Sequence, residues 1–273
     1  MNKLKHKKSF LLVGALLVSL AAVMALWAVR RHTLRLSKTV AARPTGERMA
    51  NLPRIILWAW ERPERLDFIE TREVGVAFLA KTLYLRGQRV VVRPRFQPLS
   101  VPPETQLVAV ARIESDHLDQ PALNAAQAAR LSSEIAELAR LPKVVAVQID
   151  FDARQTERNF YRQVLVELRR QLPASTALSI TALASWCSYD DWLAGLPVDE
   201  AVPMLFRMGI DRRQILSRLE SDGEFRSSIC RSSVGTSTDE PLVHMPASPR
   251  TYVFNPDVWS RSSVDEIIER HKK

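Results

Sequence analysis

Two aspartates separated by one residue close an apolar stretch, and such a pair could do acid–base chemistry. Residues 144–153 read VVAVQIDFDA. Side chains of a strand alternate between its faces, so Gln148, Asp150 and Asp152 point to one side and the apolar residues between them to the other. Two adjacent carboxylates repel each other's charge, and one of them can therefore hold a proton near neutral pH. We expect Asp152 to act as a general acid that Asp150 tunes electrostatically.

Other roles for this pair remain open. The two carboxylates could instead ligate a hard divalent cation, Mg²⁺ or Ca²⁺, as in a metal-dependent hydrolase. One of them could also cap the following helix, for which Thr156 is another candidate. His117 and His244 are the only histidines between residue 54 and the extreme C-terminus, which argues against a multi-histidine zinc site. We expect no metal and no cofactor.

The segments that must position these residues alternate between strand-like and helix-like patterns. The apolar runs predict eight strands, at residues 54–60, 89–93, 107–113, 144–153, 177–183, 201–206, 226–235 and 251–254. Helical periodicity predicts helices at 124–140, 156–171, 212–219 and 263–271, and a first helix within 67–83. Eight strands alternating with helices predict an α/β fold, a (β/α)₈ barrel of the TIM type. An open doubly wound sheet is the competitor, but no glycine-rich phosphate loop follows any strand.

Such a barrel carries its chemistry at the carboxyl ends of its strands, where further polar and aromatic residues fall. Glu114 or Glu240 could supply a second carboxylate, and Arg112 and Arg207 could hold hydroxyls or an acidic sugar. Indole faces stack on sugar rings, which makes tryptophans at these ends candidate platforms. The candidates for substrate binding are Trp60, Glu61, Arg95, Arg112, Gln148, Trp186, Met204, Arg207, Glu240 and Trp259, and Glu114 joins the two aspartates as a catalytic candidate.

Several of these residues also have purely structural interpretations. Arg112, Glu114 and Arg95 could form a buried ion-pair network that closes the barrel. Trp58 and Trp60 could be core or interface aromatics, and Met204 could simply pack.

The N-terminal region differs from the rest of the chain. Residues 9–29 contain no charged residue and follow four lysines, and 21 apolar residues are enough to cross a hydrocarbon core of ~30 Å. We expect residues 1–30 to be an uncleaved membrane anchor, with a signal peptide cleaved after Ala25 as the alternative. Residues 31–53 would be a linker and residues 54–273 the barrel. The lysine-rich amino end favours an inner-membrane protein with its barrel in the periplasm or otherwise exported.

The net charge of +9 does not indicate nucleic-acid binding. Residues 1–50 hold ten Lys or Arg and one acid, and the remaining 29 basic and 29 acidic residues cancel. We therefore expect no nucleic-acid partner, and the sequence does not identify protein partners. Cys187 and Cys230 suit an oxidising compartment as one disulfide, but two separate buried thiols fit equally well.

Six stretches of the chain resemble a bacterial family. They read ILWAWERPE, RPRFQPL, QIDFDARQTERNFY, LSITALASWC, PVDEAVPMLFRMG and GTSTDEP. Between Arg54 and Trp259 the chain is similar to the uncharacterised family called domain of unknown function 3142, which implies no settled biochemistry.

A more distant similarity implies an activity. VAVQIDFD resembles the fourth-strand motif of chitinase-like family 18 glycoside hydrolases, in which Asp152 would occupy the position of the glutamate proton donor and Gln148 and Asp150 those of the preceding acids. VDEAVPMLFRMG resembles the sixth strand of that group, a Met-x-Tyr-Asp motif. Met204 matches, but Phe206 replaces the tyrosine and Arg207 the aspartate, which puts a substrate-assisted mechanism in doubt.

The residues and the resemblance together predict a membrane-anchored, exported, glycoside-hydrolase-like barrel. Its partner would be a cell-envelope or secreted polysaccharide, and the membrane would be contacted through the N-terminal helix. A shorter aspartate in the donor position matters, because a misplacement of 1 Å can cost ~10²-fold in rate. The alternative is therefore a glycan-binding or envelope scaffold protein of the same fold without catalytic activity.

Overall fold

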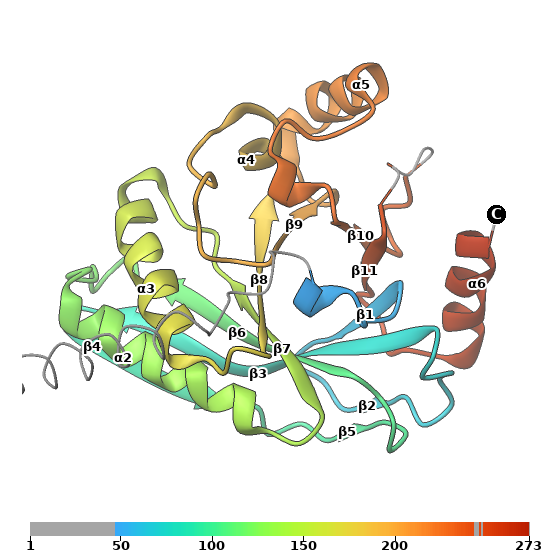
Figure 1. The fold of residues 1–273 in the computed structure, drawn as a ribbon, viewed down its shortest axis with the longest axis horizontal. Coiled ribbons are helices and arrows are strands. Elements are labelled where there is room, and N and C mark those ends of the chain that lie inside the picture. The colour runs from blue at the N-terminus through green and yellow to red at the C-terminus, as the bar shows by residue number, and fades with distance from the viewer. Residues whose placement is uncertain (1–46, 243–245, 247, 273) are drawn as a thin grey trace, which may run out of the picture. The chain divides into compact units, whose positions relative to one another are not determined.

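A closed barrel of eight parallel strands dominates the computed structural model, which describes residues 47–242, 246 and 248–272 (Figure 1). Each strand pairs in parallel with the next, and the last pairs with the first. In spatial order the strands are β1 (Ile55–Ala59), β3 (Val74–Arg86), β6 (Leu107–Ser115), β7 (Val144–Asp150), β8 (Ala177–Leu183), β9 (Glu200–Met204), β10 (Ser233–Ser237) and β11 (Arg250–Phe254). The predicted α/β barrel is confirmed, and the open sheet is excluded.

Five α-helices are present in the described residues, fewer than the eight of a complete (β/α)₈ barrel. They follow β6, β7, β8, β9 and β11, and four of them confirm predicted helices. They are α2 (Ala125–Ala136), α3 (Arg158–Gln171), α4 (Ala184–Tyr189), α5 (Arg212–Asp222) and α6 (Arg261–Lys272). Short 3₁₀ turns accompany them, namely η1 (Glu47–Met49), η2 (Glu137–Arg140), η3 (Gln155–Glu157), η4 (Gly209–Asp211) and η5 (Ser228–Cys230).

The prediction of a helix within residues 67–83 is wrong, because the 13-residue strand β3 begins at Val74. Most of β3 is buried, since the barrel interior covers one face and other elements cover the other. A segment buried on both faces has no clear alternation, so its periodicity does not separate strand from helix. Gly75 is a local sign of the strand: a Cβ there would lie 2.8 Å from Cδ1 of Ile56 on the neighbouring strand β1.

The predicted second strand exists but lies outside the barrel. It is β4 (Arg89–Pro94), which pairs antiparallel with β3 through a tight turn at Gly87, whose φ is +46°. The expected number of eight barrel strands was right only because β4 was counted and β3 was missed. Two further short strands, β2 (Glu64–Arg65) and β5 (Leu99–Ser100), form a separate parallel pair.

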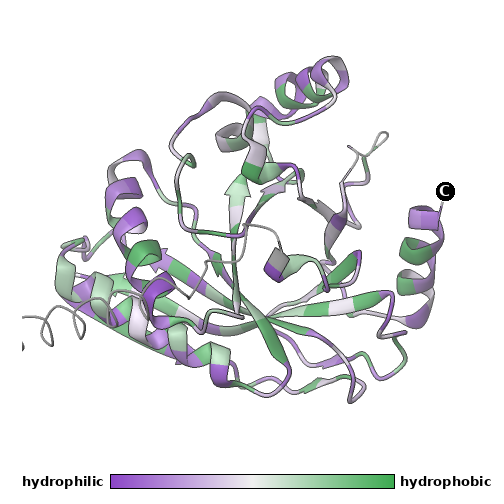
Figure 2. Ribbon diagram, in the orientation of Figure 1, coloured by the Kyte–Doolittle hydropathy of each residue, from purple (hydrophilic) through white to green (hydrophobic). Residues whose placement is uncertain are grey.

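The strand β7 shows how the barrel separates its two layers. Val147, Ile149 and Phe151 belong to the core that packs under the helices, whereas Ala146 belongs to the barrel interior. Helices α2 and α3 cover this side, and Figure 2 shows hydrophilic residues alternating with hydrophobic ones along α3 and α6. The alternation expected from the sequence therefore directs Gln148 and Asp150 inward.

Part of the predicted linker packs on the barrel. The side chains of Met49 and Leu52 are 3% and 7% exposed and join the interior core near the amino ends of the strands. Arg48 donates a hydrogen bond of 2.6 Å to Asp199. The expected anchor, residues 1–30, and the linker up to residue 46 lie outside the described residues. Within the described part of the chain, no helix has both the length and the apolar character needed to cross a membrane.

The two cysteines form a disulfide, which decides between the alternatives left open above. Cys187 in α4 is bonded to Cys230 in η5 across 43 positions of sequence. The bond therefore joins the segments that flank β9 and α5, and β9 leads into the site described next.

Candidate functional site

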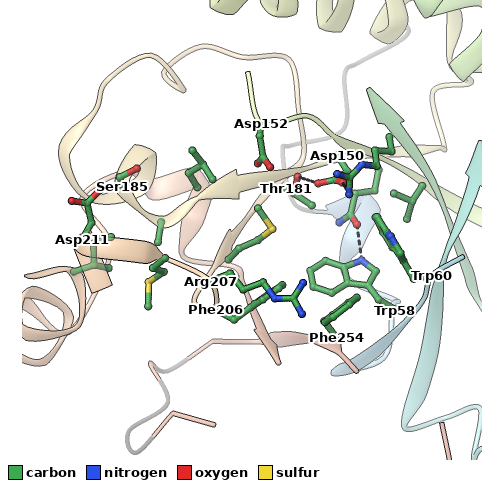
Figure 3. A pocket seen from close by; sticks show the side chains of 18 residues that line it. Trp58, Trp60, Asp150, Asp152, Thr181, Ser185, Phe206, Arg207, Asp211 and Phe254 are labelled. Carbon is green, nitrogen blue, oxygen red and sulfur yellow. Dashed lines mark hydrogen bonds and ion pairs between the residues drawn. The ribbon is translucent and has the colours of Figure 1, made fainter. Parts of the chain in front are cut away.

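A cavity of about 350 Å³ opens at the carboxyl ends of the barrel strands. Six strands or the residues directly after them contribute to its lining: β1, β6, β7, β8, β9 and β11. Seven of the predicted site residues line it, namely Trp60, Arg112, Gln148, Asp150, Asp152, Met204 and Arg207. Figure 3 shows Asp150, Asp152 and Thr181 on one side of this cavity, facing aromatic side chains on the other.

The two aspartates differ in their surroundings. Asp150 is only 9% exposed, and its Oδ1 accepts a hydrogen bond of 2.8 Å from the hydroxyl of Thr181. Its Oδ2 lies 3.5 Å from a guanidinium nitrogen of Arg112. Asp152 is exposed and reaches the cavity beyond the end of β7. One carboxyl group is thus held in place and the other is accessible.

Burial gives this pair an unusual proton affinity. Loss of solvation, together with the charge of Asp152, raises the pKa of Asp150 to about 6, although Arg112 and Thr181 oppose the shift. Partial loss of solvation by the surrounding cavity walls also raises the pKa of Asp152, although its side chain reaches solvent, and the charge of Arg112 opposes the shift. Because the two groups interact, their titration belongs to the pair. The pair can therefore retain a proton in mildly acidic solution, with the large shift on Asp150 rather than on the expected Asp152.

Four aromatic rings form the opposite wall of the cavity. The rings of Phe206 and Phe254 stack with centroids 5.7 Å apart and an angle of 3° between their planes. Trp58 lies 6.2 Å from Phe206, and Trp60 meets Phe254 edge-on at 6.4 Å. The indole N–H of Trp58 donates a 3.0 Å hydrogen bond to Gln148, which orients the ring. Such a wall can accept the apolar face of a sugar ring.

Two arginines lie beside these rings. The guanidinium of Arg112 is 5.6 Å from the Trp60 centroid, and its Nε donates a 2.7 Å hydrogen bond to Glu114. Burial opposes the charge of Arg112, yet the carboxylates of Asp150, Glu114 and Asp152 raise its pKa. The guanidinium of Arg207 lies 5.1 Å from the Phe254 centroid.

Glu114 lines a second cavity that adjoins the first. This cavity has a volume of about 540 Å³, and Arg112, Asp150 and Asp152 line both. The expected pairing of Arg112 with Glu114 is present, but Arg95 takes no part in it. Instead, Arg95 donates hydrogen bonds to the backbone carbonyls of Trp60, Arg62 and Gln97.

The other two predicted acids make contacts outside the cavity lining. Glu61 pairs with Arg93 of β4. Both carboxylate oxygens of Glu240 lie 3.2 Å from the backbone nitrogen of Arg207, and one accepts a 2.8 Å hydrogen bond from Arg212. Glu240 therefore supports the loop after β9 and does not line the cavity as a second carboxylate.

Two of the expected sugar platforms are covered. Trp186 is 4% exposed and packs against Trp192, with ring centroids 4.9 Å apart. Trp259 is 3% exposed, and its indole N–H donates a 3.0 Å hydrogen bond to the carbonyl of Trp58. Both lie near strand ends, as the sequence indicates, but other elements pack over them and neither lines the cavity.

Sequence reasoning did not select four lining residues that the geometry makes prominent. Trp58 was considered a core or interface aromatic, and it is buried at 3% exposed while its ring also lines the cavity. Phe206 was noted only as a departure from a motif. Thr181 and Phe254 lie in the apolar strand segments 177–183 and 251–254, and nothing in those segments indicated a role in binding or catalysis for either residue. Thr181 could have been found from its register, because β7 and β8 are adjacent parallel strands.

The donor groups at the site do not form a clear metal centre. Among residues 47–272, excluding the undescribed positions near residue 245, no three His, Cys, Asp or Glu side chains are grouped so that they could hold an ion. The alternative in which carboxylates bind a cation therefore rests on Asp150 and Asp152 alone.

Comparison with known proteins gives one similarity, to a family without an assigned activity. No curated protein matches the chain. Residues 104–206 match the family model described as Domain of unknown function (DUF3142). The matched segment runs from just before β6 to the loop after β9, so it contains both aspartates, Arg112, Thr181 and Phe206. Over this segment, which is less than half of the chain, the protein is similar to the DUF3142 family.

Proposed function

We propose that this protein is a glycoside-hydrolase-like barrel that acts on a cell-envelope or secreted polysaccharide. One observation carries the proposal: an aspartate pair of raised pKa faces a wall of aromatic rings across an open cavity at the carboxyl ends of the strands. Glycosidic bonds are commonly cleaved by paired carboxyl groups, one of which must hold a proton at the working pH. The distant similarity of VAVQIDFD to family 18 glycoside hydrolases supports the same class.

The two aspartates would divide the work according to their accessibility. Asp152 reaches the open cavity and would transfer a proton to the glycosidic oxygen as the bond between that oxygen and the anomeric carbon breaks. A water molecule would add its hydroxyl to the anomeric carbon and give its proton back to the carboxylate pair. Asp150, fixed by Thr181 and close to Arg112, would hold the shared proton and return it to Asp152. A sugar ring would stack on Trp60 or on the Phe206–Phe254 pair, with Arg112 and Arg207 placed to bind its polar groups.

Export is part of the proposal. The apolar run at residues 9–29 and the basic charge confined to the first 50 residues support an inner-membrane anchor with a periplasmic barrel. The disulfide between Cys187 and Cys230 supports an oxidising compartment.

The test is hydrolysis of envelope and secreted glycans by the purified protein and by Asp152→Asn. We expect the substitution to lower kcat by at least about 10²-fold, the usual contribution of a general acid, while binding is retained. Asp222→Asn on the exposed side of α5 is the matched control and should act as wild type. Equal rates for wild type and Asp152→Asn would remove the catalytic assignment.

A second candidate function is glycan binding without cleavage. It is favoured by the shorter acid at position 152 and by Phe206 and Arg207, which line the cavity where the sixth-strand motif of the hydrolases has Tyr and Asp. In that case Asp150→Asn and Asp152→Asn would both keep their affinity for glycan, and no protein, wild type included, would release product.

A further inference from the structure

We propose that Arg207 makes this cavity selective for glycans that carry carboxylate groups, such as polysaccharides containing uronic acids. The inference rests on the proposed function, because it concerns the substrate class of the same cavity. It follows from three features of Arg207: the free donors of its side chain, the support of its backbone, and its place beside the aromatic wall.

The guanidinium N–H groups of Arg207 are available to bind a ligand. Its side chain is 58% exposed, and the nearest carboxylate oxygen, that of Asp239, lies 3.9 Å away, beyond hydrogen-bond distance. Within the described residues, Arg207 makes no side-chain hydrogen bond. Arg112, by contrast, already donates to Glu114 and Asp150. Arg207 is therefore the cavity arginine available to a ligand.

The backbone at Arg207 is held in a conformation that few side chains adopt. Its φ is +52°, in the left-handed region, which costs a residue other than glycine about 1 kcal/mol or more. Glu240 accepts the Arg207 backbone N–H, and Arg212 fixes Glu240 from the other side. Strain maintained by a second layer of contacts is common at ligand-binding positions.

The position of the guanidinium suits a carboxylate attached to a sugar ring. It lies over Phe254, which stacks on Phe206, and Figure 3 shows it directed along the aromatic wall toward Trp58. A pyranose stacked on these rings would bring a substituent at its edge within reach of Arg207. The planar guanidinium can then bind both oxygens of a carboxylate, which is stronger and more specific than a bond to a hydroxyl.

The protonation of Asp150 affects how well the cavity accepts an anion. Its lining contains the cations Arg112 and Arg207 and the acids Asp150, Asp152 and Asp211. Glu114 lies 2.7 Å from Arg112 and Asp239 lies 3.9 Å from Arg207, so both acids also face these cations. Protonation of Asp150 removes one negative charge from this group and lowers the repulsion that a bound carboxylate meets. Binding of an anionic glycan should therefore strengthen as the pH falls toward 6.

The experiment measures the affinity of the purified protein, by titration calorimetry at pH 6, for alginate and polygalacturonate oligosaccharides and for neutral cello- and chito-oligosaccharides of equal length. We expect wild type to prefer the uronate oligosaccharides. Arg207→Gln should weaken their binding by about 10- to 100-fold, the range for a hydrogen bond to a charged group, and should change neutral binding by less than about 3-fold. Arg207→Lys should restore only part of the affinity, because an ammonium group lacks the planar pair of donors.

Arg218→Gln is the matched control, since it removes the same charge from α5 outside the cavity lining. It should bind as wild type does. If the wild type binds neutral oligosaccharides as well as uronates, or if Arg207→Gln and Arg218→Gln behave alike, the selectivity is refuted while the proposed glycan function survives. If no oligosaccharide of either kind binds, the proposed function itself fails.

Discussion

At the scale of single residues, neighbouring positions on one strand face have very different environments. Gln148 is fully buried, Asp150 is nearly so, and Asp152 is exposed in the cavity, although all three share one face of β7 and its continuation. The gradient arises because the strand runs from the packed interior of the barrel to its open end. Depth along the strand therefore separates a structural amide from a buried acid and an accessible one.

The raised pKa of Asp150 predicts a pH dependence of stability. The folded state keeps this proton up to a pH of about 6, whereas an unfolded Asp loses it near its model value of 3.8. Between these values the folded state binds more protons, so the unfolding free energy falls as the pH rises. Relative to Asp150→Asn, the wild type should lose about 2 kcal/mol between pH 4 and pH 7.

Urea unfolding of both proteins across this pH range measures the difference. Asp222→Asn, an exposed acid on α5, should follow the wild-type curve and controls for general charge effects. A constant difference between wild type and Asp150→Asn from pH 4 to pH 7 would show that Asp150 has an ordinary pKa in the folded protein.

At the scale of elements, the position of the aromatic wall depends on a glycine in a neighbouring strand. A Cβ at Gly235 in β10 would lie 3.1 Å from Cη2 of Trp58 and 3.4 Å from the carbonyl oxygen of Pro203. Because Gly235 has no side chain, the Trp58 indole has the space it needs to donate its hydrogen bond to Gln148. The strands β1, β7 and β10 are thus coupled through one side chain.

Gly235→Ala should displace the Trp58 ring and destabilise the protein by about 1–3 kcal/mol, the usual cost of overpacking. Much of that cost should disappear in a Trp58→Phe background, because the smaller ring does not extend to the added methyl group. A double-mutant cycle from urea unfolding gives the coupling. Additive effects of the two substitutions would mean that Gly235 and Trp58 do not compete for the same space.

Helices could be predicted from the sequence at this scale, but the hairpin of β3 and β4 could not. The positions of α2, α3, α5 and α6 follow from their local patterns, because each helix buries one stripe and exposes the other. The assignment fails at β3, whose neighbours on both sides bury it, and at β4, which looks like a barrel strand but pairs antiparallel at an edge. Both errors concern pairing between segments, which a local pattern does not contain.

At the scale of the whole molecule, the folded body begins earlier in the chain than the composition indicates. Met49 and Leu52 fill the amino end of the barrel interior, and Arg48 pairs with Asp199, which also binds Arg169. The backbone carbonyl of Met49 accepts a hydrogen bond from Arg250. The cavity with the two aspartates lies at the opposite ends of the same strands.

A chain that begins at residue 54 should therefore be less stable than one that begins at residue 46. The loss of the buried Met49 and Leu52 side chains should cost about 3–6 kcal/mol in the free energy of unfolding. Thermal and urea unfolding of the two proteins measure the difference in unfolding free energy. Met49→Ala in the longer chain removes part of the same buried surface and should show a smaller loss. Equal stabilities would mean that residues 46–53 contribute nothing to the barrel.

Sequence alone determined the alternation of strands and helices typical of an α/β barrel, four of its helices and the shared face of Gln148, Asp150 and Asp152, because periodicity is a local property of the chain. The number of strands agreed only because β4 was counted in place of β3. It also determined that the positive charge is confined to the first 50 residues, since this needs only counting. The tertiary structure decided which residues near strand ends reach the cavity. Trp186 and Trp259 do not line the cavity, whereas the partly exposed Phe206 and Phe254 and the buried Trp58 do, because contact with the cavity depends on which distant segment packs over each strand end.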